Sequence, residues 1–135
     1  MPLDQDQVHD FARAYTEAWC SHDPARVAGH YVPGGTIAIN GGEATEITEV
    51  ARSFMSAFPD IQVFMEDVLF KQGFVEFHWT FTGTNTGPGG TGKWVRISGF
   101  EEWTFGDDGL VAESRGHYDQ AEYDRQLEHG APAIQ

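Results

Sequence analysis

The segment 110–119 carries the densest group of side chains in this sequence that could do chemistry. On the period-2 pattern of a β-strand, Glu113, Arg115, His117 and Asp119 share one face of that segment. In one interpretation this is an edge strand whose ionisable groups are solvated, with Arg115 pairing to Glu113 or Asp119. In the other, these groups line a cavity where burial and neighbouring charges tune a carboxylate for proton transfer. The pattern by itself favours the solvated edge strand.

A glycine-rich segment from Gly87 to Lys93 matches the first seven positions of the phosphate-binding pattern G-x-x-x-x-G-K. The eighth residue is Trp94, where coordination of Mg²⁺ requires Ser or Thr. The segment also joins two predicted strands, whereas a phosphate-binding loop leads into a helix. We therefore interpret it as a glycine-permissive connection between strands and not as a nucleotide site.

The six histidines show no metal-binding spacing. Neither H-E-x-x-H nor H-x-H occurs, and the single cysteine, Cys20, excludes cysteine-rich zinc patterns and an intrachain disulfide. His117 and Asp119 are two potential ligands on one strand face, an arrangement that is common by chance. No G-x-S-x-G motif is present, and Cys20 lies amid no cationic cluster. We therefore expect no metal, no cofactor and no nucleophilic triad.

The segment 74–82 alternates between two faces of different polarity. One face carries the apolar and aromatic residues Val75, Phe77, Trp79 and Phe81, and the other carries Phe74, Glu76, His78, Thr80 and Thr82. The aromatic face is typical of a core, and His78 alone is typical of a structural histidine. Which face points into an enclosed space depends on strand register, because a one-residue error reverses every assignment.

Composition bounds the class of protein. The chain has 135 residues, 40% hydrophobic content and a net charge of −13, which fits one globular domain and excludes global disorder. This acidity disfavours nucleic acid and anionic membrane surfaces as partners. No apolar run approaches the 18 residues of a membrane span, and the first residues lack the features of a signal peptide. Together with the lone cysteine, these features predict a cytoplasmic protein.

Hydrophobic periodicity predicts helices followed by strands. Apolar stripes at helical spacing indicate helices over 8–19 and 47–58, and an Asp-Pro start indicates a short helix over 24–30. Segments rich in Val, Ile, Phe, Trp and Thr predict strands over 36–39, 61–70, 74–82, 94–105 and 110–119. We expect one α+β domain over residues 1–127, with helices packed on one sheet face, and a loose tail over 128–135.

Two segments resemble a known family. The run Trp79 to Gly87, and the run Asp108 to Glu113 followed by Tyr118 and Asp119, are similar to the corresponding segments of SnoaL-like polyketide cyclases. This resemblance extends from about residue 8 to residue 127. It implies the cone-shaped α+β fold of nuclear transport factor 2-like proteins, with three N-terminal helices packed on a curved, mainly antiparallel sheet.

The resemblance also implies an activity. In the cyclases, an Asp near the end of the last strand acts as acid and base in an intramolecular aldol ring closure, and the matching position here is Asp119. His117 and Arg115 share its face and become secondary catalytic candidates. In some members a histidine on the preceding strand assists, and its counterpart here falls around Trp103 or Thr104. The glycine-rich segment of the family commonly has a histidine after Gly-Thr, where this chain has Asn85.

The expected function is cofactor-independent acid/base chemistry, namely cyclisation, isomerisation or dehydration of a small to medium apolar carbonyl compound. The alternatives are a non-catalytic domain that binds an apolar ligand and a purely structural dimer module. Cavity volume separates them, since a functional pocket usually offers roughly 300 Å³ or more. The family usually pairs through its exposed sheet face, so we expect a homodimer. The residues expected to line the pocket are Tyr15, Trp19, Tyr31, Phe58, His78, Trp79 and Trp103.

Overall fold

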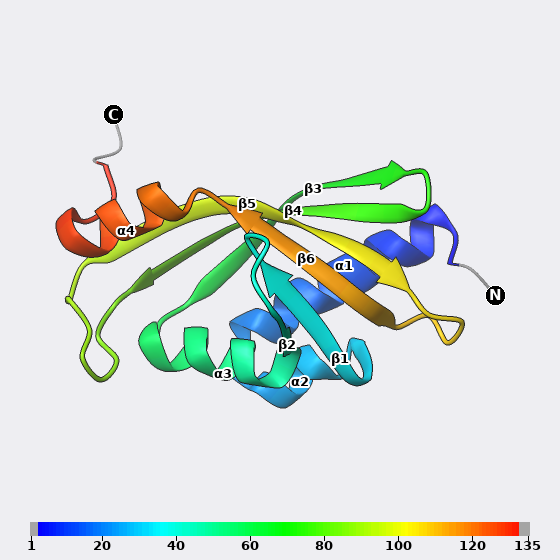
Figure 1. The fold of residues 1–135 in the computed structure, drawn as a ribbon, viewed down its shortest axis with the longest axis horizontal. Coiled ribbons are helices and arrows are strands. Elements are labelled where there is room, and N and C mark those ends of the chain that lie inside the picture. The colour runs from blue at the N-terminus through cyan, green and yellow to red at the C-terminus, as the bar shows by residue number, and fades with distance from the viewer. Residues whose placement is uncertain (1–2, 133–135) are drawn as a thin grey trace.

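The computed structural model describes residues 3–132 of the chain, which form four helices and six strands (Figure 1). In chain order these elements are α1 (Gln5–Cys20), α2 (Pro24–Ala28), β1 (Tyr31–Ile39), β2 (Ala44–Glu46), α3 (Ile47–Ala57), β3 (Gln62–Lys71), β4 (Phe74–Thr84), β5 (Trp94–Phe105), β6 (Val111–Tyr118) and α4 (Gln120–His129).

The six strands form one curved, open sheet in the order β2-β1-β6-β5-β4-β3. Every neighbouring pair is antiparallel except β1 and β6, which run parallel. Figure 1 shows α1, α2 and α3 gathered against one face of this sheet, while α4 lies at the end of the long strand β5. The expected α+β cone with three N-terminal helices on a mainly antiparallel sheet is confirmed.

Local sequence explains where the helices begin and which side they bury. Asp4 and Gln7 form a capping box at the start of α1, and Asp23 caps α2 with Pro24 in its first turn. The apolar stripe of α1 is buried against the sheet through Val8, Ala12, Tyr15, Ala18 and Trp19. Ile47, Ala51 and Met55 do the same for α3. The core therefore lies between these helices and the inner sheet face.

Tight turns set the register of the long strands. Gly73, between β3 and β4, has a φ of +91°, and Gly109, between β5 and β6, has a φ of +78°, values that favour glycine. The glycine-rich segment after β4 connects two strands, as its interpretation as a connection requires. Asn85 holds it in place, donating to the carbonyl of Ala57 and accepting from the amide of Thr91.

Two elements differ from the sequence expectation. The short strand β2 was not predicted, and the chain continues after β6 as helix α4, so Glu128 and His129 are helical where a loose tail was expected. Helix α4 has a weak apolar stripe, but Asp119 caps it and Tyr123 packs against Tyr118 and Phe81. Residues 133–135 of the expected tail lie outside the described part, as do residues 1 and 2.

Between residues 3 and 132, no helix combines the length and apolar character needed to cross a membrane.

Candidate functional site

An apolar cavity lies between the inner face of the sheet and the helices. Its walls are mainly aromatic and aliphatic, and the aromatic lining residues are Trp19, Phe54, Phe77, Trp79, Phe81 and Tyr118. Among its described lining residues, Glu101 is the only carboxylate. The cavity measures about 60 Å³, below the roughly 300 Å³ typical of ligand pockets. As it stands, it fits only a small ligand.

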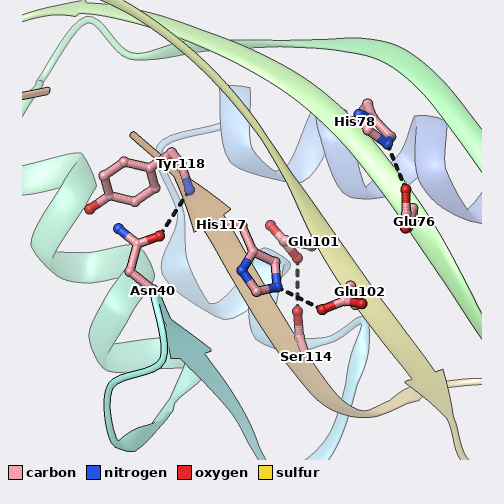
Figure 2. A network of polar contacts seen from close by, with 8 residues as sticks. All are labelled: Asn40, Glu76, His78, Glu101, Glu102, Ser114, His117 and Tyr118. Carbon is pink, nitrogen blue, oxygen red and sulfur yellow. Dashed lines mark hydrogen bonds and ion pairs between the residues drawn. The ribbon is translucent and has the colours of Figure 1, made fainter. Parts of the chain in front are cut away.

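Glu101 lies in the middle of β5 and is buried, with 6% of its surface exposed. Four side chains contact its carboxylate: Tyr15 from α1, Tyr31 from β1, Trp103 from β5 and Ser114 from β6. Two of them also face each other, with 3.3 Å between the hydroxyl oxygens of Tyr15 and Tyr31. Figure 2 shows Ser114 reaching the carboxylate from the neighbouring strand.

The two oxygens of the carboxylate have different surroundings. Oε1 accepts from the Trp103 indole at 2.9 Å and from the Tyr15 hydroxyl at 3.0 Å, and it has further contacts of 3.3 Å with the Tyr31 and Ser114 hydroxyls. Oε2 has a single contact, 3.3 Å from the Tyr15 hydroxyl. Oε1 is therefore fully engaged, while Oε2 keeps lone-pair capacity for a proton or a ligand.

Burial governs the electrostatics of this group. Removal of the carboxylate from water raises the pKa of Glu101 above its ordinary value of 4.5, although the four hydrogen-bond donors oppose the increase. Burial and the neighbouring carboxylate also raise the pKa values of Tyr15 and Tyr31 well above 10, so both remain protonated donors. None of the groups in hydrogen-bond contact with Glu101 is cationic. A desolvated carboxyl with a raised pKa is suited to exchanging a proton with a bound substrate.

A glycine opens the space beside Glu101. In the sheet register, Glu101 lies opposite Gly116 of β6 on one side and Phe77 of β4 on the other. The adjacent row holds Trp79, Gly99 and Tyr118. Gly116 carries no side chain and itself lines the cavity, whereas the Trp79 ring fills the place of a side chain on Gly99.

Trp79 adds an unsatisfied donor to the cavity wall. Its indole Nε1 is buried, and it is the one buried side-chain nitrogen or oxygen among residues 3–132 that has no hydrogen-bond partner. Buried polar groups are nearly always paired in native structures, so an unpaired one calls for an explanation.

The candidates of the last strand lie elsewhere. Asp119 is exposed at the N-cap of α4, where its carboxylate accepts a hydrogen bond from the amide of Glu122. Arg115 is exposed on the outer face of the sheet. His117 is paired there with Glu102, at 2.6 Å between Nε2 and Oε1. The structure thus differs from the expected site, because Ser114, Gly116 and Tyr118 occupy the inner face instead.

His78 also lies on the outer face. It pairs with Glu76 at 3.0 Å (Figure 2). Its ring stacks on Phe100, which stacks in turn on His117. Its neighbour Phe77 lines the cavity, and alternation along β4 turns His78 away from it. The expectation that His78 lines the pocket therefore differs from its observed position.

The remaining expected lining residues fall into two groups. Trp19 and Trp79 line the cavity. Tyr15, Tyr31 and Trp103 are fully buried behind it, where they donate to Glu101. Phe58 packs behind Phe81, at 5.3 Å between ring centroids.

Glu101 was not among the residues predicted for the site, although the residue pattern of its strand indicates that it is buried. On a period-2 pattern, the strand 94–105 places Glu101 on the same face as Val95, Ile97 and Trp103, three residues that are buried. A carboxylate within an apolar stripe is a candidate buried acid.

Residues 3–132 contain no group of three or more His, Cys, Asp or Glu side chains able to hold a metal ion. The polar groups around Glu101 are hydroxyl and indole donors, which suit a carboxylate and not a cation.

Comparisons with known proteins agree with this architecture. No curated protein sequence is significantly similar to the chain. Among solved structures, AclR from Streptomyces galilaeus, assigned as a hydroxylase, is 20% identical with a TM-score of 0.77, over 93% of this chain and 98% of that one. A protein from Jannaschia sp. CCS1, assigned as a SnoaL-like polyketide cyclase, is 23% identical with a TM-score of 0.72, over 90% of each chain.

A third structure was solved with a ligand. This protein of ketosteroid isomerase-like fold from Catenulispora acidiphila DSM 44928, in complex with trimethylamine, is 11% identical with a TM-score of 0.71, over 84% of this chain and 88% of that one. At these identities the likeness concerns the fold. The model of the SnoaL-like polyketide cyclase family matches residues 9–127. The chain therefore belongs to the SnoaL-like polyketide cyclase family.

Proposed function

We propose that this protein catalyses cofactor-independent proton transfer on a small apolar carbonyl compound, with Glu101 as the general acid and base. The observation that carries the proposal is the difference in surroundings between the two oxygens of the Glu101 carboxylate. Oε1 is held by hydrogen bonds, Oε2 is nearly free, and the side chain lines an apolar cavity. A positioned carboxyl with a raised pKa contributes about 10²- to 10⁴-fold to a proton-transfer rate.

The chemistry follows from the ionised form. Oε2 takes a proton from the carbon beside the substrate carbonyl, and the C–H electron pair forms the enolate double bond while charge moves onto the carbonyl oxygen. Return of the proton to a different carbon isomerises the substrate. Attack of the enolate carbon on a second carbonyl of the same molecule closes a ring, and the alkoxide that forms takes the proton back from Glu101. Loss of a β-hydroxyl as water, after its protonation, dehydrates the molecule.

The proposal moves the catalytic role from Asp119 to Glu101. In the structure Asp119 caps α4, and His117 pairs with Glu102. Arg115 lies on the outer face of the sheet and is therefore not part of the proposed site in the cavity. The cavity volume of about 60 Å³ is below the roughly 300 Å³ expected of a functional pocket, so the proposal rests on the surroundings of Glu101 and is confined to the smallest substrates.

A test needs no natural substrate. Exchange of the α-protons of cyclopentanone for deuterium in D₂O reports enolisation, and proton NMR measures its rate. We expect Glu101→Gln to lower the protein-catalysed rate at least about 100-fold. Asp119→Asn is the matched control, because Asn also caps helices, and its rate should equal that of the wild type. Equal rates for wild type and Glu101→Gln, or a loss confined to Asp119→Asn, would refute the assignment.

A non-catalytic binding role is the second candidate, and the aromatic cavity wall favours it. An ionised Glu101 beside Trp19 and Trp79 offers a small organic ammonium ion both a counter-charge and cation–π contacts. The related structure with trimethylamine makes trimethylammonium a suitable probe. Saturable binding that Glu101→Gln removes, without any α-proton exchange on cyclopentanone, would select this role.

The proposal includes a homodimer formed through the outer sheet face, without nucleic acid or membrane as a partner. Support comes from the outer face itself, which no helix of the described residues covers, and from Phe64, whose exposed fraction is 49%. A second copy would remove such apolar surface from water.

A further inference from the structure

The buried indole N–H of Trp79 needs an acceptor that the described chain does not supply. Leaving a buried donor unpaired costs about 1–3 kcal/mol. The side chain of Trp79 lines the cavity, which makes an occupant of the cavity the candidate acceptor for its N–H.

Packing fixes the ring that carries this donor. A side-chain carbon placed on Gly99 would lie 2.8 Å from the Trp79 ring, which therefore lies directly on the β5 backbone. The ring also packs against Phe81 and Tyr118, with centroid distances of 6.2 and 6.3 Å. The indole therefore has little freedom to turn toward another acceptor, and its N–H is held in place before a ligand arrives.

The donor and the carboxylate lie in neighbouring rows of the sheet. Trp79 pairs with Gly99, and Glu101 is two residues further along the same strand, so the two backbone rows are about 7 Å apart. Both side chains line the same cavity, so one small molecule with an oxygen acceptor and an acidic C–H can contact both. The rest of the lining is almost entirely apolar.

We propose that Trp79 Nε1–H is the hydrogen-bond donor that receives the carbonyl oxygen of the ligand and so selects oxygen-bearing ligands over hydrocarbons of the same shape. This inference rests on the proposed function. Under it, the same donor also stabilises the enolate oxygen that forms when Glu101 removes the α-proton.

Two probes of nearly equal shape test this assignment. Cyclopentanone carries the acceptor, and methylenecyclopentane replaces it with a CH₂ group. The four tryptophans each give an indole N–H resonance in a ¹H–¹⁵N spectrum, and Trp79→Phe identifies that of Trp79. We expect cyclopentanone to shift the Trp79 resonance downfield and to slow its exchange with water, while methylenecyclopentane produces neither effect.

Affinity provides the second readout. Trp79→Phe should weaken cyclopentanone binding about two- to tenfold and leave methylenecyclopentane binding unchanged. Trp94→Phe is the matched control, because Trp94 is 41% exposed and does not line the cavity, and it should alter neither affinity.

Several outcomes would overturn the inference. These are an unmoved Trp79 resonance on saturation with cyclopentanone, equal losses of affinity for both probes in Trp79→Phe, or no binding of either probe at millimolar concentration. Repeating the titration with Glu101→Gln separates this inference from the proposed function. If the Trp79 shift persists in Glu101→Gln and this variant has lost exchange activity, the donor role of Trp79 is supported. If the shift persists and the exchange activity is unchanged, only the catalytic role of Glu101 is refuted.

Discussion

At the scale of single residues, the site depends on which of two adjacent glutamates faces inward. Glu101 is buried among two tyrosines, a tryptophan and a serine, whereas Glu102 pairs with His117 on the outer face. Because side chains alternate along a strand, Glu101 and Glu102 must point to opposite faces of the sheet. The sequence alone does not say which of the two points inward. The sequence pattern of the last strand favoured Asp119 because several ionisable residues lie close together there. In the structure these residues lie on the side that is turned away from the cavity.

The raised pKa of Glu101 has a consequence for stability. A carboxyl whose pKa increases on folding binds its proton more tightly in the native state, so its contribution is full below about pH 4.5 and is lost as pH rises through the folded pKa. Glu101→Gln carries no charge at any pH. We expect its unfolding free energy, relative to wild type, to rise with pH by about 1.4 kcal/mol per unit of the pKa increase. Urea unfolding between pH 4 and pH 8 measures this difference, and parallel curves would contradict it.

At the scale of elements, the sequence predicted what local patterns encode and missed what depends on packing. The stripes of α1 and α3 and the strands β3, β4, β5 and β6 could be read from residue patterns, and the start of α2 from its Asp-Pro pair. Helix α4 could not, because its apolar side has few residues and its stability depends on contacts with β5 and Tyr118. The hollow beside Glu101 was equally hidden, since it requires Gly116 and Glu101 to meet across two strands.

Two glycine substitutions distinguish the effect of a narrowed cavity on activity from the effect of a disturbed sheet on stability. A side-chain carbon on Gly116 would lie 3.3 Å from the flexible end of Ile37, so Gly116→Ala should fold normally while narrowing the space beside Glu101. We expect it to reduce α-proton exchange on cyclopentanone about tenfold, an order of magnitude typical of one displaced contact. Gly99→Ala is the contrast, because its carbon would lie 2.3 Å from the carbonyl oxygen of His117. It should instead destabilise the fold by about 1–3 kcal/mol. Full exchange activity in Gly116→Ala would show that substrate does not approach Glu101 past this position.

At the scale of the whole molecule, three helices cover one face of the sheet, and no helix of residues 3–132 covers the other. The sequence predicted this layering, because apolar helix stripes need an apolar sheet face to pack on. The parallel pairing of β1 and β6 was not foreseen, because it joins segments far apart in the chain. That pairing sets Tyr31 beside the carboxylate, and so the overall topology builds the site.

The bare face underlies the prediction about assembly. Light scattering after size exclusion should give twice the 15.0 kDa of one chain. Phe64→Asp should shift the mass toward that of one chain, because a charge there would be buried between two copies. Phe70→Ser is the control, since Phe70 is similarly exposed but contacts His9 of α1 on the helix side. A wild-type mass of 15 kDa would reject the dimer.

The pKa of Glu101 is the measurement to make first, because the proposed catalytic role of this side chain depends on a desolvated carboxyl. Carbon-detected NMR of the side-chain carboxyls, with Glu101→Gln for assignment, follows its titration. We predict a pKa above the ordinary 4.5, since burial outweighs the hydrogen bonds from Tyr15, Tyr31, Trp103 and Ser114. A pKa at or below 4.5 would mean a solvated or charge-compensated carboxylate, and it would contradict the assignment of Glu101 as the proton-transfer group.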